Sequence, residues 1–385
     1  MFSTVIGLDL IRIKLGARMT ISGRRTINAP RKALLTAISA VIVSMILAAC
    51  GSSSPASSAK SSSSSATTSA SAAAAAYFKG KTITIIAPDS PGGDFDLYAR
   101  IIAPALGKYL GATVNVENVP GAATIVGTNQ MAAAAPNGLM LGMIDTSADI
   151  GSLIQKKPGQ NFDLTKLSWI GQMGTSPDVF ITSPKSGVTT FSQLLHTTTP
   201  INVLDTSGSL GDLFNKAVLG AFHIPYKLIT GYGTSSALKQ GLLANDGQYL
   251  FENLPPFLSM LRGGQAKALL VTSEPTLSTL KQAVGNATTL SQALKSVTLT
   301  SAETAALNEV QSLSNLDFDL AGPPGIPAAR LAVLRSAFQK ALSDPSTVTK
   351  ANTESEPLGY VSGPQVASNV TSAISKGSAI LVYVK

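Results

Sequence analysis

The chain contains very few of the side chains that catalyse reactions or bind metals. Among its 385 residues there are one cysteine, Cys50, and two histidines, His196 and His223. One thiol cannot form an internal disulfide, and two histidines are too few for a histidine-rich metal cluster. His223 precedes I-P-Y where a strand is expected to begin, which favours a packed or surface histidine over a general base. We therefore expect no metal, no cofactor and no catalytic residue.

Three sequence patterns of nucleotide and hydrolase sites are also missing. No G-x-G-x-x-G follows the first expected strand, and G-x-x-x-x-G-K-[ST] occurs nowhere, which argues against dinucleotide and phosphate loops. The Gly/Ser loops contain no G-x-S-x-G, so neither Ser207 nor Ser209 is expected on a nucleophile elbow.

The first fifty residues have the pattern of a secretory signal. Four basic residues within 24–32 precede an apolar run that ends in L-A-A-C at Cys50. A basic region, an apolar region and small residues in this order are typical of a signal peptide. L-A-A-C followed by Gly51 resembles a bacterial lipobox, which predicts removal of residues 1–49, with Met19 as an alternative start, and lipidation of Cys50. An ordinary signal with a chance cysteine, or an uncleaved helix, is the alternative.

Most of the positive charge belongs to that segment. Residues 1–49 hold seven Lys/Arg and one acidic residue, a net of +6 out of the formal +8, which leaves +2 for the rest. With no block of Lys/Arg and aromatic residues after Cys50, we expect no nucleic-acid partner. Residues 50–76 begin with Cys50 and continue as a Ser/Ala-rich tether with no reason to fold.

Residues 77–385 alternate between β-branched runs and amphipathic runs. Strands are expected at 82–87, 113–118, 139–144, 201–205, 226–231, 248–251 and 267–272, and helices at about 95–110, 124–135, 209–221, 234–244, 327–343 and from 363. Pro104 is expected to kink the first of these helices. Strands separated by helices indicate right-handed βαβ units.

The fold predicted is α/β, with two lobes like those of periplasmic binding proteins (a Venus flytrap). Each lobe would be a mainly parallel sheet flanked by helices, and two crossing strands would join them. Lobe 1 is expected to comprise 77–180 and 315–385, and lobe 2 to comprise 181–314. Ligands of such folds bind beyond the carboxyl ends of the strands, here in the cleft between lobes.

Four loops at carboxyl ends of expected strands are rich in Gly, Ser and Thr. They read S-P-G-G-D at 90–94, V-P-G-A-A-T at 119–124, D-T-S-G-S at 205–209 and T-G-Y-G-T-S-S at 230–236. Glycine lets the backbone approach a ligand, and the free N–H groups of a first helical turn favour an anion. The four loops together indicate a site of about the size of a carboxylate.

The motifs P-G-G-x-x-D-x-x-A-R, E-N-x-P-G-A and A-A-P-x-G follow one another between Pro91 and Gly138. With N-F-D-L-T-K-L-S-W-I-G-Q, T-G-Y-G-T and A-G-P-P-G-I-P-A-A-R further on, this ordered set resembles the tripartite tricarboxylate transporter substrate-binding receptors, or Bug proteins. The resemblance covers essentially all of 77–385. It implies an extracytoplasmic receptor in which backbone N–H groups of the P-G-G and P-G-A loops bind a ligand carboxylate.

Carried over by position, the resemblance gives a set of ligand-binding residues. They are Pro91, Gly92, Gly93, Asp96, Gly121, Ala122, Gly208, Ser209, Gly233 and Thr234, and we add Asp94 and Ser207 from the same loops as further candidates. Arg100 matches a basic position of the family, and equally it could pair with Asp96 within the helix.

The sequence departs from the family pattern at the site itself. Asp94 stands where a third glycine is usual and Phe95 where Thr, Ser or Tyr is common; Val119 replaces an arginine, and Ala123 and Thr124 replace glycines. An added carboxylate and a lost cation disfavour a di- or trianion such as citrate. A monocarboxylate, or a zwitterion whose ammonium meets Asp94 or Glu252, fits better, unless Asp94 only caps the helix.

We therefore expect a lipid-anchored, monomeric receptor without covalent chemistry that captures a mono- or dicarboxylate or an amino acid. Its partners would be the membrane subunits of a tripartite carrier, and it would lie outside the cytoplasm, anchored to the membrane through Cys50. The alternatives are a sensory receptor that signals to a kinase, an extracytoplasmic hydrolase, and a family member that has lost its ligand.

Overall fold

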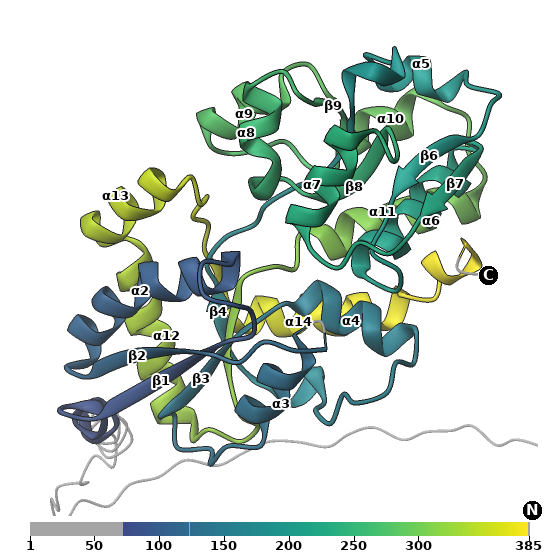
Figure 1. Ribbon diagram of the computed structural model, residues 1–385. Helices are drawn as coiled ribbons and strands as arrows, with labels where there is room; N and C mark the ends of the chain where they lie inside the picture. Colours follow the sequence, from purple (N-terminus) through teal and green to yellow (C-terminus); the bar gives the residue numbers. More distant parts are fainter. Residues whose placement is uncertain (1–71, 123, 384–385) are drawn as a thin grey trace, which may run out of the picture. The chain divides into compact units, whose positions relative to one another are not determined.

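The computed structural model describes residues 72–122 and 124–383 (Figure 1). The expected signal peptide, Cys50 and most of the expected tether lie outside these residues. Residues 72–78 are helical, and Phe78 is fully buried. The last five residues of the expected tether are thus part of a helix, because the apolar anchor that follows them gives this helix a place to pack.

Two six-stranded sheets form the framework. The first has the order β12-β4-β11-β3-β1-β2, with β1 (Thr82–Ala87), β2 (Thr113–Asn118), β3 (Met140–Ile144), β4 (Ser168–Gln172), β11 (Asp319–Gly322) and β12 (Val361–Ser362). The second has the order β10-β9-β5-β8-β6-β7, with β5 (Asp178–Thr182), β6 (Ile201–Leu204), β7 (Tyr226–Ile229), β8 (Tyr249–Asn253), β9 (Lys267–Val271) and β10 (Thr288–Thr289). The expected strands are therefore present, with ends shifted by at most two residues.

The helices lie between and over these strands (Figure 1). They are α2 (Asp94–Leu110), α3 (Ile125–Ala132), α4 (Thr146–Ile154), α5 (Phe191–Leu195), α6 (Leu210–Ala221), α7 (Ser235–Ala244), α8 (Leu258–Arg262), α9 (Ser278–Val284), α10 (Leu290–Ser296), α11 (Ser301–Ser314), α12 (Ala328–Leu342), α13 (Pro345–Glu354) and α14 (Gly363–Lys376). Short 3₁₀ turns are η1 (Leu164–Lys166), η2 (Pro184–Ser186), η3 (Pro255–Phe257) and η4 (Ile380–Tyr383). Helix α2 runs through Pro104 without a break.

The two sheets repeat one topology. In the first, β3-β1-β2 are parallel neighbours connected through α2 and α3; in the second, β8-β6-β7 are parallel neighbours connected through α6 and α7. Beside β3 lies the antiparallel β11, and beside β8 lies the antiparallel β5. Both sheets are therefore mixed.

Two of the antiparallel strands, β5 and β11, are those by which the chain changes sheet, and the short edge strand β12 also runs antiparallel to β4. The chain leaves β4 in the first sheet and enters β5 in the second across residues 173–177, and it returns from α11 to β11 across 315–318. A strand that arrives directly from the other sheet, without a βαβ crossover, is free to run antiparallel to its neighbours. Because β5 begins at Asp178, the second sheet starts three residues before the expected boundary at 181.

Three apolar clusters hold the framework together. One packs α2 and α12 on a face of the first sheet, with Tyr98, Phe338 and Ile85 among its members. A second packs α7, α8 and α9 on a face of the second sheet. The largest joins the other faces of both sheets through α4, α6, α11 and α14, and includes Trp169 and Phe251. This shared cluster fixes the strand ends that form the site.

Candidate functional site

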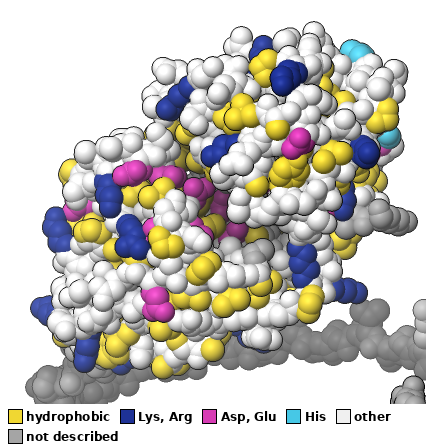
Figure 2. All heavy atoms as spheres, viewed as in Figure 1, with side chains coloured by type: hydrophobic (Ala, Val, Ile, Leu, Met, Phe, Trp, Pro, Cys, Tyr) yellow, Lys and Arg dark blue, Asp and Glu magenta, His cyan; other side chains and the backbone are white. Residues whose placement is uncertain are grey.

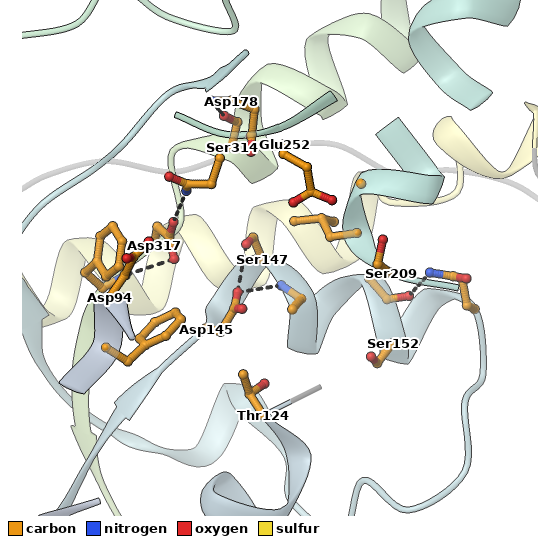
Figure 3. A pocket seen from close by; sticks show the side chains of 18 of the residues that line it. Asp94, Thr124, Asp145, Ser147, Ser152, Asp178, Ser209, Glu252, Ser314 and Asp317 are labelled. Carbon is orange, nitrogen blue, oxygen red and sulfur yellow. Dashed lines mark hydrogen bonds between the residues drawn. The ribbon is translucent and has the colours of Figure 1, made fainter. Parts of the chain in front are cut away.

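A cavity of about 240 Å³ lies where β3 and β8 end and where α2, α4 and α6 begin (Figure 3). It therefore occupies the place at which α/β folds bind ligands, beyond the carboxyl ends of parallel strands. Its lining consists of Asp94, Phe95, Thr124, Asp145, Ser147, Ala148, Gly151, Ser152, Gln155, Lys157, Asp178, Ser209, Leu210, Gly211, Glu252, Asn253, Ser314, Asp317 and Phe318.

Five carboxyl groups face this small space. Asp94 opens α2, Asp145 precedes α4, and Asp317 lies in the returning connection; Asp178 opens β5 and Glu252 lies in β8. Figure 2 shows Asp and Glu side chains gathered in a hollow of the face that it views. The cavity is thus acidic on both the side of the first sheet and the side of the second.

Lys157 is the one basic residue of the lining. Burial lowers the pKa of its ammonium group, and this group donates a hydrogen bond to the carbonyl oxygen of Gly208. Lys157 therefore links the segment after α4 with the loop before α6, and one of its donors is already used.

Burial keeps these carboxyl groups from ionising readily. Removal from water raises the pKa of Asp94 to about 6, that of Asp178 to about 7 and that of Glu252 to about 8. Neighbouring carboxylates raise the pKa of Glu252 further. Burial also raises the pKa values of Asp145 and Asp317. Desolvation and mutual repulsion both oppose a cavity with five negative charges and a single lysine to balance them.

Asn253 and Asp317 connect the two sheets across the cavity. Asn253 Nδ2 donates to Asp317 Oδ2 over 3.2 Å, and the Phe318 N–H donates to Asp317 Oδ1 over 3.2 Å. Asn253 Oδ1 is buried and has no hydrogen-bond partner among the described residues. An unpaired buried acceptor is costly, so a donor that reached this oxygen would stabilise the site.

Phe318 holds an unusual backbone conformation at the cavity wall. Its φ is +52°, which a bulky residue rarely adopts and which costs energy. The ring stacks on Tyr98 with centroids 4.1 Å apart, and it also contacts the ring of Phe95, with centroids 5.1 Å apart. This packing stabilises the strained residue and places an aromatic wall beside Asp94 and Asp317.

The P-G-G loop does not leave its backbone donors free. Gly92 N–H donates to Asp96 Oδ2 over 2.9 Å and Gly93 N–H to the carbonyl oxygen of Ser90 over 3.0 Å. The Phe95 and Asp96 N–H groups at the start of α2 donate to Asp89 Oδ2 over 3.0 and 3.4 Å. In this structure the carboxylate that occupies the N-terminus of α2 is the chain's own Asp89.

Asp96 and Arg100 form the pair within the helix that the sequence left open. Arg100 Nε lies 2.8 Å from Asp96 Oδ1, and Asn118 Nδ2 donates to the same oxygen over 3.0 Å. These donors lower the pKa of Asp96 despite its burial. Asp96, like Pro91, Gly92 and Gly93, does not line the cavity, whereas Asp94 does. Asp94 is the first residue of α2, and its side chain caps no helical N–H group, because Gly93 is the N-cap.

The loop before α6 repeats the arrangement of the P-G-G loop. Gly208 N–H donates to Asp212 Oδ2 over 2.9 Å, and Lys216 lies 2.8 Å from Asp212 Oδ1. Ser209 caps α6 by accepting from the Asp212 N–H over 3.0 Å, and it lines the cavity, while Ser207 and Gly208 do not. Thus Gly, Asp and a basic residue recur at intervals of four residues in α2 and α6.

The remaining predicted residues lie outside the cavity lining. Gly233 and Thr234 are exposed, and Thr234 caps α7 by accepting from the Ala237 N–H over 3.1 Å. Gly121 and Ala122 have positive φ values of 141° and 48°, and the cavity residue Thr124 has a φ of 76°. A positive φ is the backbone conformation that glycine adopts most readily. Of the twelve predicted residues, the structure brings Asp94 and Ser209 into the cavity.

Two cavity residues, Asp145 and Ser147, belong to a short sequence that occurs twice in the chain. Asp145-Thr146-Ser147 follows β3 as Asp205-Thr206-Ser207 follows β6, so the repeated D-T-S could have identified Asp145. Asp178 and Asp317 lie next to the crossings between sheets, and only the tertiary fold brings them to the cavity.

The described lining residues offer hydrogen-bonding and acidic side chains but no histidine or cysteine. No group of three or more His, Cys, Asp or Glu side chains in the described ranges is placed to hold a metal ion. His223 lies away from the cavity on the surface, where its Nε2 is 2.8 Å from Glu303 Oε1. Two linked sheets with a polar cavity at their strand ends are the architecture of two-lobed solute-binding proteins.

Comparison with known proteins identifies the family. Residues 98–381 match the model of the tripartite tricarboxylate transporter family receptor, TctC, and the chain belongs to this family. BugT of Bordetella pertussis is 29% identical over 211 residues, covering 51% of this chain and 62% of BugT. A second Bordetella pertussis protein, of the UPF0065 group, is 27% identical over 283 residues, covering 70% of this chain and 79% of its own length.

Solved structures of the family share the fold. A TctC solute-binding protein from Polaromonas has a TM-score of 0.61 at 18% identity and covers 78% of this chain and 98% of its own. BugD has a TM-score of 0.59 at 19% identity, with coverages of 78% and 97%. MatC of Rhodopseudomonas palustris with bound malate has a TM-score of 0.56 at 21% identity, with coverages of 78% and 99%. Within the described residues, no helix combines the length and apolar character needed to cross a membrane.

Proposed function

We propose that this protein is an extracytoplasmic receptor that captures a small organic solute and delivers it to the membrane subunits of a tripartite carrier. The observation that carries this proposal is the polar cavity formed by strand ends of both sheets in a chain of the TctC family. Capture requires no covalent step.

The solute class follows from the charge of the lining. MatC is described with malate and another neighbour from Rhodopseudomonas palustris with adipate, both of which are dicarboxylates. Five carboxyl groups and one lysine line the cavity of this protein. Among the solutes that the sequence suggests, an amino acid fits better than a dicarboxylate, because its ammonium group can pair with a carboxylate.

Delivery would use the two connections between the sheets. Residues 173–177 and 315–318 join the strands of one sheet to those of the other, and a solute that contacts both sides of the cavity favours a closed arrangement. The closed form would then bind the carrier. A lipid on Cys50 and the Ser/Ala-rich tether would hold the receptor, as a monomer, at the membrane surface.

Native mass spectrometry of the full chain isolated from its own cells tests the proposal. We expect unfolding of the protein to release one small molecule that the protein has not altered chemically. Spin labels at Glu117 of β2 and Lys227 of β7, both exposed, should report a changed distance distribution when that molecule is added back. Recovery of a chemically altered molecule would indicate an enzyme. The proposal would be contradicted if the protein retained no solute and the distance distribution between the two spin labels did not change.

A further inference from the structure

We propose that the solute carries a net positive charge: it is a small organic cation with primary ammonium groups, such as a diamine or a basic amino acid. This inference rests on the proposed function and names the substrate class of the same cavity.

The charges of the lining are far from balanced. The carboxyl groups come from α2, the N-cap of α4 and the return crossing on one side, and from β5 and β8 on the other. Lys157 is the one basic residue among the lining residues, and it is hydrogen-bonded to Gly208. An anion placed here would meet acidic groups on both sides, whereas a cation would meet an acceptor from each sheet.

The helix N-termini that could attract an anion are already capped. Asp89 accepts from the first turn of α2, and Asp145 Oδ1 accepts from the Ala148 N–H at the start of α4 over 2.9 Å. At the start of α6, the Ser209 hydroxyl accepts from the Asp212 N–H, and the Asp212 carboxylate accepts from the Gly208 N–H. Two of the three positive helix ends therefore hold a carboxylate of the chain itself, and the dipoles that favour an anion are offset.

Two further features point to a ligand that donates hydrogen bonds. Asn253 lines the cavity, and its side-chain oxygen Oδ1 is buried with no hydrogen-bond partner in the described part of the chain. Asp178 is 8% exposed and lies at the cavity beside Ser314 (Figure 3), which is already one of its hydrogen-bond partners. Ammonium groups supply three donors each and no acceptor, which matches acceptors of this kind.

The lining also explains why the cation is organic. No three acidic or histidine side chains among the described residues converge on a point that suits a metal ion, so the charges suit an extended molecule. Phe95, Phe318 and Leu210 add apolar surface between the carboxyl groups. Aromatic faces attract ammonium groups and cover the hydrocarbon that joins them.

The number of protons released or taken up on binding tests the inference without any mutation. The ionisable groups that surround the cavity carboxyls are Asp89, Asp94, Tyr98, Asp145, Asp149, Lys157, Asp178, Asp205, Lys239, Glu252, Asp317, Asp319 and Glu356. Because a cation favours the ionised form of these acids, its binding releases protons, and its affinity rises by roughly tenfold per pH unit for each proton released. A carboxylate would bind the protonated acids and take up protons.

The experiment is isothermal titration calorimetry of the full chain between pH 6 and 8. Putrescine, L-lysine, L-glutamate, succinate, malate, adipate and Ca²⁺ are each titrated in two buffers of different ionisation enthalpy. We expect putrescine or L-lysine to bind with proton release and more tightly at pH 8. Glu252→Gln should weaken this binding at least tenfold. Glu309→Gln should not change it, since Glu309 is a buried glutamate of α11 outside the cavity lining.

The other outcomes overturn the inference or support it. Binding of succinate, malate or adipate with proton uptake overturns it and leaves the receptor function intact, and so does binding of Ca²⁺ alone. If the panel is silent, the charge of the molecule recovered by native mass spectrometry decides: a cation supports the inference and an anion or neutral molecule overturns it. If no molecule is recovered either, the proposed function fails with it.

Discussion

Gly93 is needed for a contact that the sequence did not reveal. A Cβ atom at this position would lie 2.2 Å from Asp89 Oδ2, and this oxygen accepts from two N–H groups at the start of α2. The φ of Gly93 is −78°, which any residue adopts. The glycine is therefore required for the close approach of Asp89 and not for its backbone freedom.

This contact leads to a prediction at the scale of single residues. Gly93→Ala should displace the Asp89 carboxylate and lower the free energy of unfolding by about 1–2 kcal/mol, as the loss of a helix cap does. In an Asp89→Ala background the same substitution should cost much less, since no carboxylate is left to displace. Urea unfolding of the four variants measures the cycle. Equal costs in both backgrounds would show that Gly93 serves another purpose.

At the scale of the elements, α2 and α6 begin with the same device. A glycine N–H donates to an aspartate four residues on, and that aspartate pairs with a basic residue four further on: Gly92, Asp96 and Arg100 in one, Gly208, Asp212 and Lys216 in the other. Asp96 and Asp212 are both buried. The device fixes each loop at a strand end and so positions the adjacent cavity residues Asp94 and Ser209.

We expect Asp96→Ala and Asp212→Ala each to destabilise the protein by about 2–3 kcal/mol, because each leaves buried donors without an acceptor. Asp163→Ala is the control: Asp163 also caps a turn and pairs with Lys166, but its side chain is 45% exposed. Its removal should cost below about 1 kcal/mol. Chemical denaturation compares the three variants, and a cost for Asp163 as large as that for Asp96 would refute the role given to burial.

For the whole molecule, buried acids predict how stability depends on pH. Burial raises the pKa of Asp89 to about 6, that of Asp178 to about 7, and those of Glu252, Asp319 and Glu356 to about 8. A raised carboxyl pKa in the folded state means that stability is fully present below the unfolded value, near 4, and is lost as pH rises through the folded value. The melting temperature of the empty protein should therefore fall between pH 5 and 8.5.

Glu252→Gln should reduce this loss of stability. Ionisation of the buried Glu252 carboxyl lowers the free energy of unfolding above pH 8 by an amount on the order of a few kcal/mol, and glutamine cannot ionise. Thermal unfolding of the wild type and the variant at pH 5 and 8.5 measures the difference. The acids whose pKa is lowered, such as Asp96 and Asp163, lose their contribution only near pH 4 and below, outside this window. A melting temperature that rises from pH 5 to 8.5 would contradict the prediction.

The alternation of apolar runs predicted most strands, because the period and the β-branched content are local properties. It placed β1 and β2 at their observed ends. It did not predict α4 or α13: α13 is polar, and α4 is only nine residues long and interspersed with Ser, Thr and Gly. Among the site residues predicted from the motifs, Asp94 and Ser209 line the cavity and the others do not.

The sequence by itself determined the two βαβ repeats, the family and the glycine loops, since each depends on residues close together in the chain. Only the tertiary structure decided the chemistry of the cavity. Asp145, Asp178, Glu252 and Asp317 come from four separate segments, and their meeting depends on how two sheets share one core. The Asp89 carboxylate lies at the N-terminus of α2 because the three-dimensional course of the preceding loop brings it there, which the sequence alone does not show. Hydrophobic period and turn residues are encoded locally, whereas the charge of a cavity is the sum of distant parts.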